Sequence, residues 1–271
     1  MQTYLVVILA VLASRVWTTL VGPLEFGMYV LYPGHIGLWL IFLLGPVLMM
    51  RGARGIPPTN GLVIAFCAGL GWAADQSVYL ILREDPGQSY WGWPAVTGTC
   101  ILTIVVLVAF WLLARRRRPA LAEKPAHGDI AGRLALCWRL FLWSMVVLLA
   151  VFRLADVGAQ LSGITYTNDE VSLFILGYEI HHIWWGTLAM MAAGLIFLWP
   201  LPTRRGLRNA SLLMSLGLGA TADELLYYME HTMTLESYLA LPSLLGALAA
   251  GIAALLIGWF TMRTLRRSLL T

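Results

Sequence analysis

Histidine and carboxylate side chains gather in the second half of the sequence, inside segments that are otherwise apolar. Imidazole nitrogens and carboxylate oxygens together bind zinc, iron or manganese, and a catalytic metal site keeps one position open for water or substrate. We therefore predict a divalent transition-metal site in this half of the chain. The predicted metal ligands are His181, His182, Asp223 and Glu224, and the predicted catalytic carboxylates are Glu179 and Glu224.

A similar but less charged set of residues lies about 146 to 148 residues earlier in the chain. The patterns Y-x-x-H and G-L-G-x-x-A-D-x-x-x-Y occur at residues 32–35 and 69–79, and again at residues 178–181 and 217–227. Residues 75–90 also align with residues 223–238 without a gap. This agreement predicts an internal duplication in which His35 matches His181 and Asp75 matches Asp223.

Each copy also has an arginine within its first apolar segment, Arg15 or Arg153. A charged side chain in hydrocarbon is costly, so these arginines need partners. At about 1.5 Å per residue, each lies roughly 20 Å along its helix, level with the aspartate of its own copy. We expect the ion pairs Arg15–Asp75 and Arg153–Asp223. The residues expected to support them are His35, Tyr79, Tyr227 and His231, with each tyrosine four residues after the aspartate and on the same helix face.

The second copy differs from the first in its added ionisable side chains. It has His182 and Glu224 where the first copy has Ile36 and Gln76. A purely architectural role would not require this one-sided enrichment, so we predict that the second copy has specialised into the working site. Two plainer explanations stay open. Histidine and glutamate cost little near helix ends that meet water, and a hydrogen-bonded polar network without metal would use the same residues.

The composition of the chain sets its class. Hydrophobic residues make up 59% of the chain and charged residues 12%, and the mean hydropathy is +0.77. We predict an all-α integral membrane protein with eight transmembrane helices, each about 20 residues long, as two parallel four-helix repeats. The repeats are residues 1–114 and 134–271, joined by a cytoplasmic linker, residues 115–133. The expected spans are residues 3–22, 35–50, 61–82, 94–114, 134–156, 181–201, 210–230 and 241–262, with the second the shortest.

The distribution of basic residues predicts the orientation. With the N-terminus inside, fifteen of the eighteen lysines and arginines fall in cytoplasmic segments, as the positive-inside rule requires. We expect a multi-pass protein of the cell (inner) membrane with both termini in the cytoplasm and the polar site near the outer, periplasmic surface. The positive charge therefore reflects topology and gives no support for binding nucleic acid. Cys67, Cys100 and Cys137 are widely spaced and predict neither a disulfide nor a C-x-x-C metal site.

Three functions are compatible with these features. The first is a metal-dependent membrane enzyme that acts on a lipid or another apolar small molecule, with Glu179 as general base. The second is a transporter or proton-coupled channel, which requires a polar path to the cytoplasm. Few charges lie below the outer third of either half, so backbone or hydroxyl groups would have to supply that path. The third is a structural or partner-binding subunit, or a haem carrier that uses His35 and a second histidine.

Overall fold

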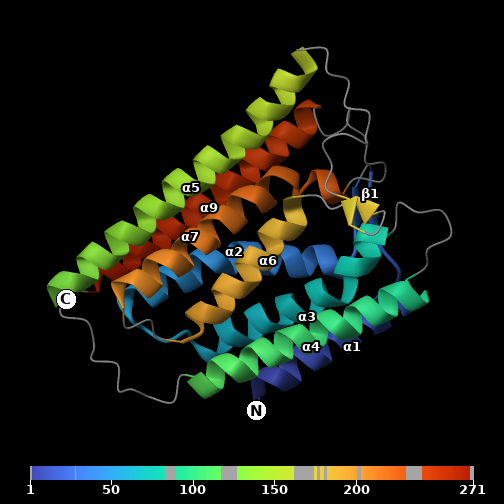
Figure 1. The fold of residues 1–271 in the computed structure, drawn as a ribbon, viewed down its shortest axis with the longest axis horizontal. Coiled ribbons are helices and arrows are strands. Elements are labelled where there is room, and N and C mark those ends of the chain that lie inside the picture. Colours follow the sequence, from blue (N-terminus) through green and yellow to red (C-terminus); the bar gives the residue numbers. More distant parts are fainter. Residues whose placement is uncertain are drawn as a thin grey trace.

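The computed structural model describes residues 2–27, 29–82, 90–116, 127–161, 174–175, 178–179, 182–199, 203–229 and 240–268. The helices of this part, shown in Figure 1, are α1 (Gln2–Leu20), α2 (Pro33–Arg54), α3 (Asn60–Leu82), α4 (Trp93–Arg116), α5 (His127–Leu161), α6 (His182–Phe197), α7 (Arg204–Glu224), the 3-10 helix η1 (Tyr227–Met229) and α9 (Leu241–Arg267). Two antiparallel hairpins precede α2 and α6: β1 (Leu24–Phe26) pairs with β2 (Tyr29–Leu31), and β3 (Phe174–Ile175) pairs with β4 (Tyr178–Glu179).

Six helices of the described part are long and apolar enough to cross a membrane, namely α1 to α5 and α9. In α1 and α4 only 17% of the residues of each spanning window are buried. Large apolar side chains such as Leu9 and Leu12 of α1 and Ile101 and Ile104 of α4 are exposed on the outside of the bundle. An exposed apolar surface of this extent is rare in soluble monomers. These helices indicate a multi-pass membrane protein.

The shortest of the long helices is α6, with 16 residues, and not α2, which has 22. The sequence predicted a short span at residues 35–50 and a full one at 181–201. Pro200 and Pro202 follow α6 closely, and proline cannot continue an α-helix. α6 crosses the bundle between its neighbours α2 and α7, so most of its surface meets protein.

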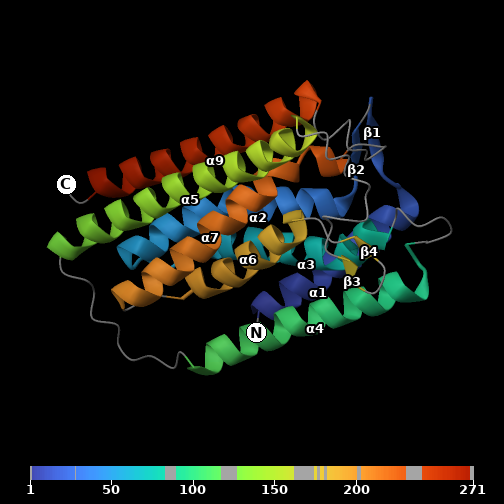
Figure 2. The ribbon, with the colours of Figure 1, turned by 45° about the horizontal axis from the view of Figure 1, so that its top comes forward.

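The two halves of the chain use the same pairs of neighbouring helices. In the first half α3 packs against α1, α2 and α4, and in the second half α7 packs against α5, α6 and α9. α2 also contacts α5, α6, α7 and α9, so it joins the halves. Figures 1 and 2 show β1 and β2 at one end of the bundle, here called the hairpin end, and the C-terminus of α9 at the opposite end, here called the linker end.

Close helix approaches recur at matching glycines. A Cβ on Gly98 of α4 would collide with Val78, and a Cβ on Gly246 of α9 would collide with Leu226. The second glycine and its contact each lie 148 residues after their counterparts in the first half. A Cβ on Gly71 of α3 would lie 2.6 Å from the Cβ of Ala10, and a Cβ on Gly219 of α7 would lie 3.0 Å from the Cβ of Leu148. Small residues let helix backbones approach each other in membranes. The two halves therefore share their contact geometry as well as their neighbours.

The boundaries of α7 and α5 differ from the sequence prediction. α7 ends at Glu224 instead of near residue 230, and the chain continues into η1. Tyr228 of η1 is fully buried, and its hydroxyl bonds to groups of other helices, which stabilises this tighter ending. α5 begins at His127, inside the predicted linker. The early start buries Ile130 and lets Arg133 donate to the main-chain oxygen of Ala53.

Candidate functional site

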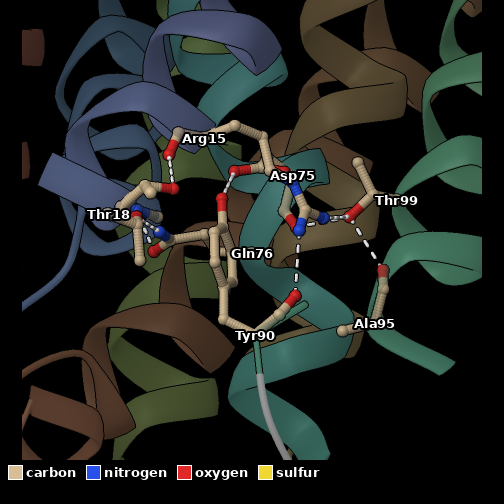
Figure 3. A network of polar contacts seen from close by, with 9 residues as sticks. Arg15, Thr18, Asp75, Gln76, Tyr90, Ala95 and Thr99 are labelled. Atoms are coloured by element: carbon tan, nitrogen blue, oxygen red, sulfur yellow. Dashed lines mark hydrogen bonds and ion pairs between the residues drawn. The ribbon is translucent and has the colours of Figure 1, made fainter. Parts of the chain in front are cut away.

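Two polar clusters lie inside the bundle toward the hairpin end, one in each half. The first cluster consists of Arg15, Asp75, Tyr90 and Thr99 and is shown in Figure 3. Arg15 Nε lies 2.6 Å from Asp75 Oδ1, and its other nitrogens donate to the main-chain oxygen of Tyr90 at 2.9 Å and to Thr99 Oγ1 at 2.6 Å. The Tyr90 hydroxyl donates to Asp75 Oδ2. The aspartate therefore has a cationic partner on one oxygen and a hydroxyl donor on the other.

Tyr90 is the member of this cluster that does not belong to a helix. It lies between α3 and α4, and the guanidinium carbon of Arg15 lies 4.1 Å from the centre of its ring. Burial raises the pKa of Tyr90 well above its usual range, and its hydrogen bond to Asp75 raises it further. The phenol therefore keeps its proton at neutral pH and donates it to the carboxylate. Tyr79, which the sequence expected here, packs its ring edge-on against Tyr90 and against Tyr32.

The second cluster consists of Arg153, His182, Asp223, Glu224 and Ser243. Arg153 Nε forms an ion pair with Asp223 Oδ1. Arg153 Nη2 donates to the main-chain oxygen of Asp223 at 2.7 Å and to Ser243 Oγ at 3.2 Å. Thr99 on α4 and Ser243 on α9 supply the corresponding hydroxyls in the two clusters. Both expected arginine–aspartate pairs are thus present, each held by a hydroxyl of the last helix of its half.

The described partners of the second carboxylate oxygen of the aspartate differ between the clusters. His182 Nε2 lies 2.9 Å from Asp223 Oδ2, and Nδ1 lies 3.5 Å from Glu224 Oε1. The imidazole therefore sits between two carboxylates, where the first cluster has the Tyr90 hydroxyl and no second acid. The side chain of His182 is 24% exposed, whereas those of Asp223 and Glu224 are 0% and 5% exposed. His182 is therefore the most exposed of the described side chains of this cluster.

A pair of main-chain contacts aligns the halves. The amide of Gly34 donates to Gln76 Oε1 at 2.7 Å, and the amide of Ile183 donates to Glu224 Oε2 at 3.0 Å. Gly34 and Ile183 are 149 residues apart, as are the first residues of α2 and α6. The residues of the paired positions Phe26↔Tyr29 and Ile175↔Tyr178 in the two hairpins are also 149 residues apart.

These contacts give a different offset from the Y-x-x-H motif. At an offset of 149 residues, His182 stands at the position of Pro33, and Trp184 stands at the position of His35. The motif match of His35 with His181 differs from this offset by three residues, and His181 lies outside the described residues. His35 has a local role: its Nδ1 accepts the amide of Tyr32 at 3.2 Å and helps cap α2.

The charges of the clusters balance differently. In the first cluster one guanidinium faces one carboxylate, and the neighbouring Gln76 is neutral. Among the described side chains of the second cluster one guanidinium faces two carboxylates, so neutrality of this set requires one additional proton. His182 faces an acidic oxygen from each ring nitrogen, and a doubly protonated imidazole can donate from both nitrogens. The geometry therefore provides a place for an exchangeable proton that the first cluster lacks.

The other residues of the predicted site lie elsewhere. His181 and His231 lie outside the described residues, and for Glu179 only the backbone, in β4, is described. Tyr227 lies in η1, beyond the end of α7, so it does not continue the helix face of Asp223. Among the side chains that the structure describes, no group of three histidines, cysteines or acids is arranged to hold a metal ion.

Sequence reasoning missed the residues that join the two halves near the second cluster. Tyr228 accepts a hydrogen bond from Trp184 Nε1 and donates to the main-chain oxygen of Leu80, both at 3.1 Å. Trp39 Nε1 donates to Met229 Sδ at 3.4 Å. In the sequence alone, aromatic residues near the ends of apolar segments are typical of an interfacial belt. A buried tyrosine requires a hydrogen-bond partner for its hydroxyl. A tyrosine inside an apolar segment therefore could have indicated such a contact.

Comparison of the chain with protein-family models, with curated proteins and with solved structures finds no significant match.

Proposed function

We propose that the protein is a proton-coupled membrane transporter or channel whose second cluster is its proton-binding site. The observation that carries this proposal is the position of His182 between Asp223 and Glu224. Histidine is the side chain whose ordinary titration lies nearest physiological pH, and buried acid–histidine chains are typical proton relays of membrane proteins. The first cluster, with its balanced ion pair, is the structural counterpart.

We propose eight spans, with α6 and α7 completing the six apolar ones. α6 begins at His182, a member of the second cluster, and ends at Phe197. Phe197 packs against the end of α2, where a Cβ on Gly52 would lie 2.5 Å from its ring. α6 therefore connects the two ends of the bundle. Its 16 residues reach about 24 Å, which is short but sufficient for a helix surrounded by protein.

The proposed orientation places the linker end in the cytoplasm of the cell and the hairpin end outside. The described basic residues at helix ends gather at the linker end, as do those flanking the connection from α4 to α5. They are Arg51, Arg54, Arg115, Arg133, Arg204, Arg205, Arg208, Arg263, Arg266 and Arg267. Positive charge beside spans favours the cytoplasmic side. Both termini then lie inside, and His182 lies near the outer surface.

We also propose that the two halves arose by duplication. The matched arginine–aspartate pairs, the matched amide contacts of Gly34 and Ile183 and the matched glycine approaches support it. Under this proposal the change from Gln76 to Glu224 and the gain of His182 added a proton site to one copy of an inherited ion pair. The two copies can therefore be compared as internal controls.

Proton flux into proteoliposomes under an imposed membrane potential tests the function. We expect flux with the native protein, loss of flux with His182→Ala, and retention with His35→Asn, whose side-chain oxygen can still accept the Tyr32 amide. No flux in the native protein, or equal loss in both variants, would contradict the proposal. A stoichiometric transition metal in the purified protein, lost with His182→Ala, would favour the metal-dependent enzyme instead.

A further inference from the structure

Buried hydroxyl groups continue from the second cluster toward the linker end. Thr221, Ser215 and Ser211 lie along α7, and Thr187 lies on the facing α6. Each is at most 1% exposed. From Asp223 to Ser211 the helix spans about 18 Å, and successive hydroxyls on α7 are about 6 to 9 Å apart along the axis. One or two water molecules can bridge such gaps between polar groups.

Two of these hydroxyls have no partner within the described part of the chain. They are Thr187 Oγ1 and Thr221 Oγ1. Thr221 Oγ1 would lie 2.6 Å from a Cβ on Gly186, so it faces α6 beside Thr187. A serine or threonine inside a membrane helix ordinarily bonds back to the carbonyl four residues earlier, as Ser215 does to Ser211 at 2.6 Å. An unpartnered buried hydroxyl costs free energy, which a transient water molecule would recover.

From Ser211, polar groups of α5 continue the series toward the linker end. Ser211 Oγ lies 3.1 Å from Cys137 Sγ. Arg133, one turn before Cys137, donates to the main-chain oxygen of Ala53 at 3.0 Å and lies 3.9 Å from Asp129, whose side chain is 43% exposed. Polar groups thus occur from the second cluster to a solvent-accessible carboxylate.

The first half has no such series at the matching positions. With the offsets of the two alignments, Thr221, Ser215 and Ser211 correspond to Ala73, Cys67 and Val63, and Thr187 corresponds to Leu38. If these hydroxyls served only to hold packed helices together, we would expect them in both copies, because both copies make the same close helix approaches. At these four pairs of positions the hydroxyls occur in the half that has His182 and Glu224, whereas the buried hydroxyls of the first half, such as Ser14 and Thr103, lie at other positions.

We propose that Thr221, Thr187, Ser215 and Ser211, with intervening water, form a proton route between the second cluster and the linker end. This inference rests on the proposed proton-coupled function and names its path. Each hydroxyl accepts a proton from one side and releases its own to the other, so the hydroxyls are unchanged and nothing is oxidised. The opposite half remains closed, and protons cross the membrane through the second half alone.

The test uses thiol hydrogen–deuterium exchange, followed by the infrared S–H band of single-cysteine proteins in lipid. Cys67 stands at the position of Ser215 and is equally buried, so it is the matched control. One protein has Ser215→Cys with Cys67→Ala, Cys100→Ala and Cys137→Ala. The control has Cys100→Ala and Cys137→Ala and keeps Cys67. Native Cys137, with Cys67→Ala and Cys100→Ala, is a second reporter that leaves the route hydroxyls unchanged.

We expect the thiol at position 215, and that of Cys137, to exchange at least about tenfold faster than Cys67, whose exchange requires local opening. Adding Thr187→Val, Thr221→Val and Ser211→Ala removes the neighbouring route hydroxyls on both sides of position 215 and should slow its exchange toward that of Cys67. Equal rates at positions 215 and 67, or no effect of these three substitutions, would overturn the route. Fast exchange without proton flux would contradict the proposed function while leaving a water path, so the two failures are distinguishable.

Discussion

The two clusters start from the same ion pair and differ in what completes it. In the first half the protonated Tyr90 donates to Asp75 and the neighbouring Gln76 is neutral, so the charges of the Arg15–Asp75 pair balance without another charged group. In the second half a histidine and an extra acid surround the Arg153–Asp223 pair. Under the proposed function, a few substitutions separate a structural ion pair from a site that exchanges a proton.

The largest expected effect follows from breaking either ion pair. Arg15→Gln removes the described cationic partner of Asp75, and Arg153→Gln leaves the two carboxylates Asp223 and Glu224 facing His182. Each substitution should lower the free energy of unfolding by about 3–5 kcal/mol. Adding Asp75→Asn to Arg15→Gln should recover part of this loss, because no charge is then stranded. Reversible unfolding in mixed detergent measures each value. Strict additivity of the two first-half substitutions would contradict a direct pair.

Exchanging the residue types at positions 76 and 224 should lower stability in the first half and proton flux in the second. Gln76→Glu places a second buried carboxylate beside Asp75 without a histidine and removes the amide that donates to Thr18. We expect a loss of about 2–3 kcal/mol at neutral pH. The loss should shrink as the pH falls, because protonation removes the added charge. Glu224→Gln should cost much less stability but abolish proton flux. Equal stability losses for the two exchanges would contradict the charge-balance account.

Removing the phenol of the first cluster should have a moderate effect. Tyr90→Phe deletes the donor to Asp75 Oδ2, and a hydrogen bond to a charged acceptor contributes about 1.5–3 kcal/mol. Because the pKa of Tyr90 is raised in the folded protein, this contribution is complete below the unfolded value of about 10 and is lost as the pH rises above it. Unfolding measured between neutral and alkaline pH should show this decline in the native protein and not in Tyr90→Phe.

The smallest effect is expected at the contact between the halves. Tyr228→Phe removes a neutral hydroxyl that links Trp184 with the main-chain oxygen of Leu80. We expect a loss of about 0.5–1.5 kcal/mol in unfolding free energy, with proton flux retained. A loss as large as that of Arg153→Gln would show that this contact, and not the ion pairs, dominates the stability of the bundle.

The sequence predicted the arginine–aspartate partners because charge in hydrocarbon must be paired and helical rise fixes depth. Arg15 and Asp75 could therefore be matched without knowing which helices touch. The register at α6 could not be predicted in the same way. His35 and His181 share a short motif, but helix α6 starts at His182 and its first turn bonds to Glu224, a long-range contact that no local pattern contains.

The metal-site hypothesis illustrates a second limit of sequence reasoning. Residue types showed that His182, Asp223 and Glu224 could meet, and they do meet. Composition could not show that Arg153 occupies one oxygen of Asp223 and that each ring nitrogen of His182 faces a different carboxylate. His181 and His231 lie outside the described residues, so the predicted fourth ligand and the outer histidine stay predictions.

Under the proposed function, His182 holds a proton that balances the charge of the second acid. Nitrogen-15 NMR of histidine-labelled protein in lipid nanodiscs reports directly which ring nitrogens carry protons, and His182→Asn assigns the signal. We predict that both ring nitrogens of His182 are protonated at neutral pH in the native protein and that Glu224→Gln converts the ring to a neutral tautomer. A neutral or metal-coordinated imidazole in the native protein would contradict the account.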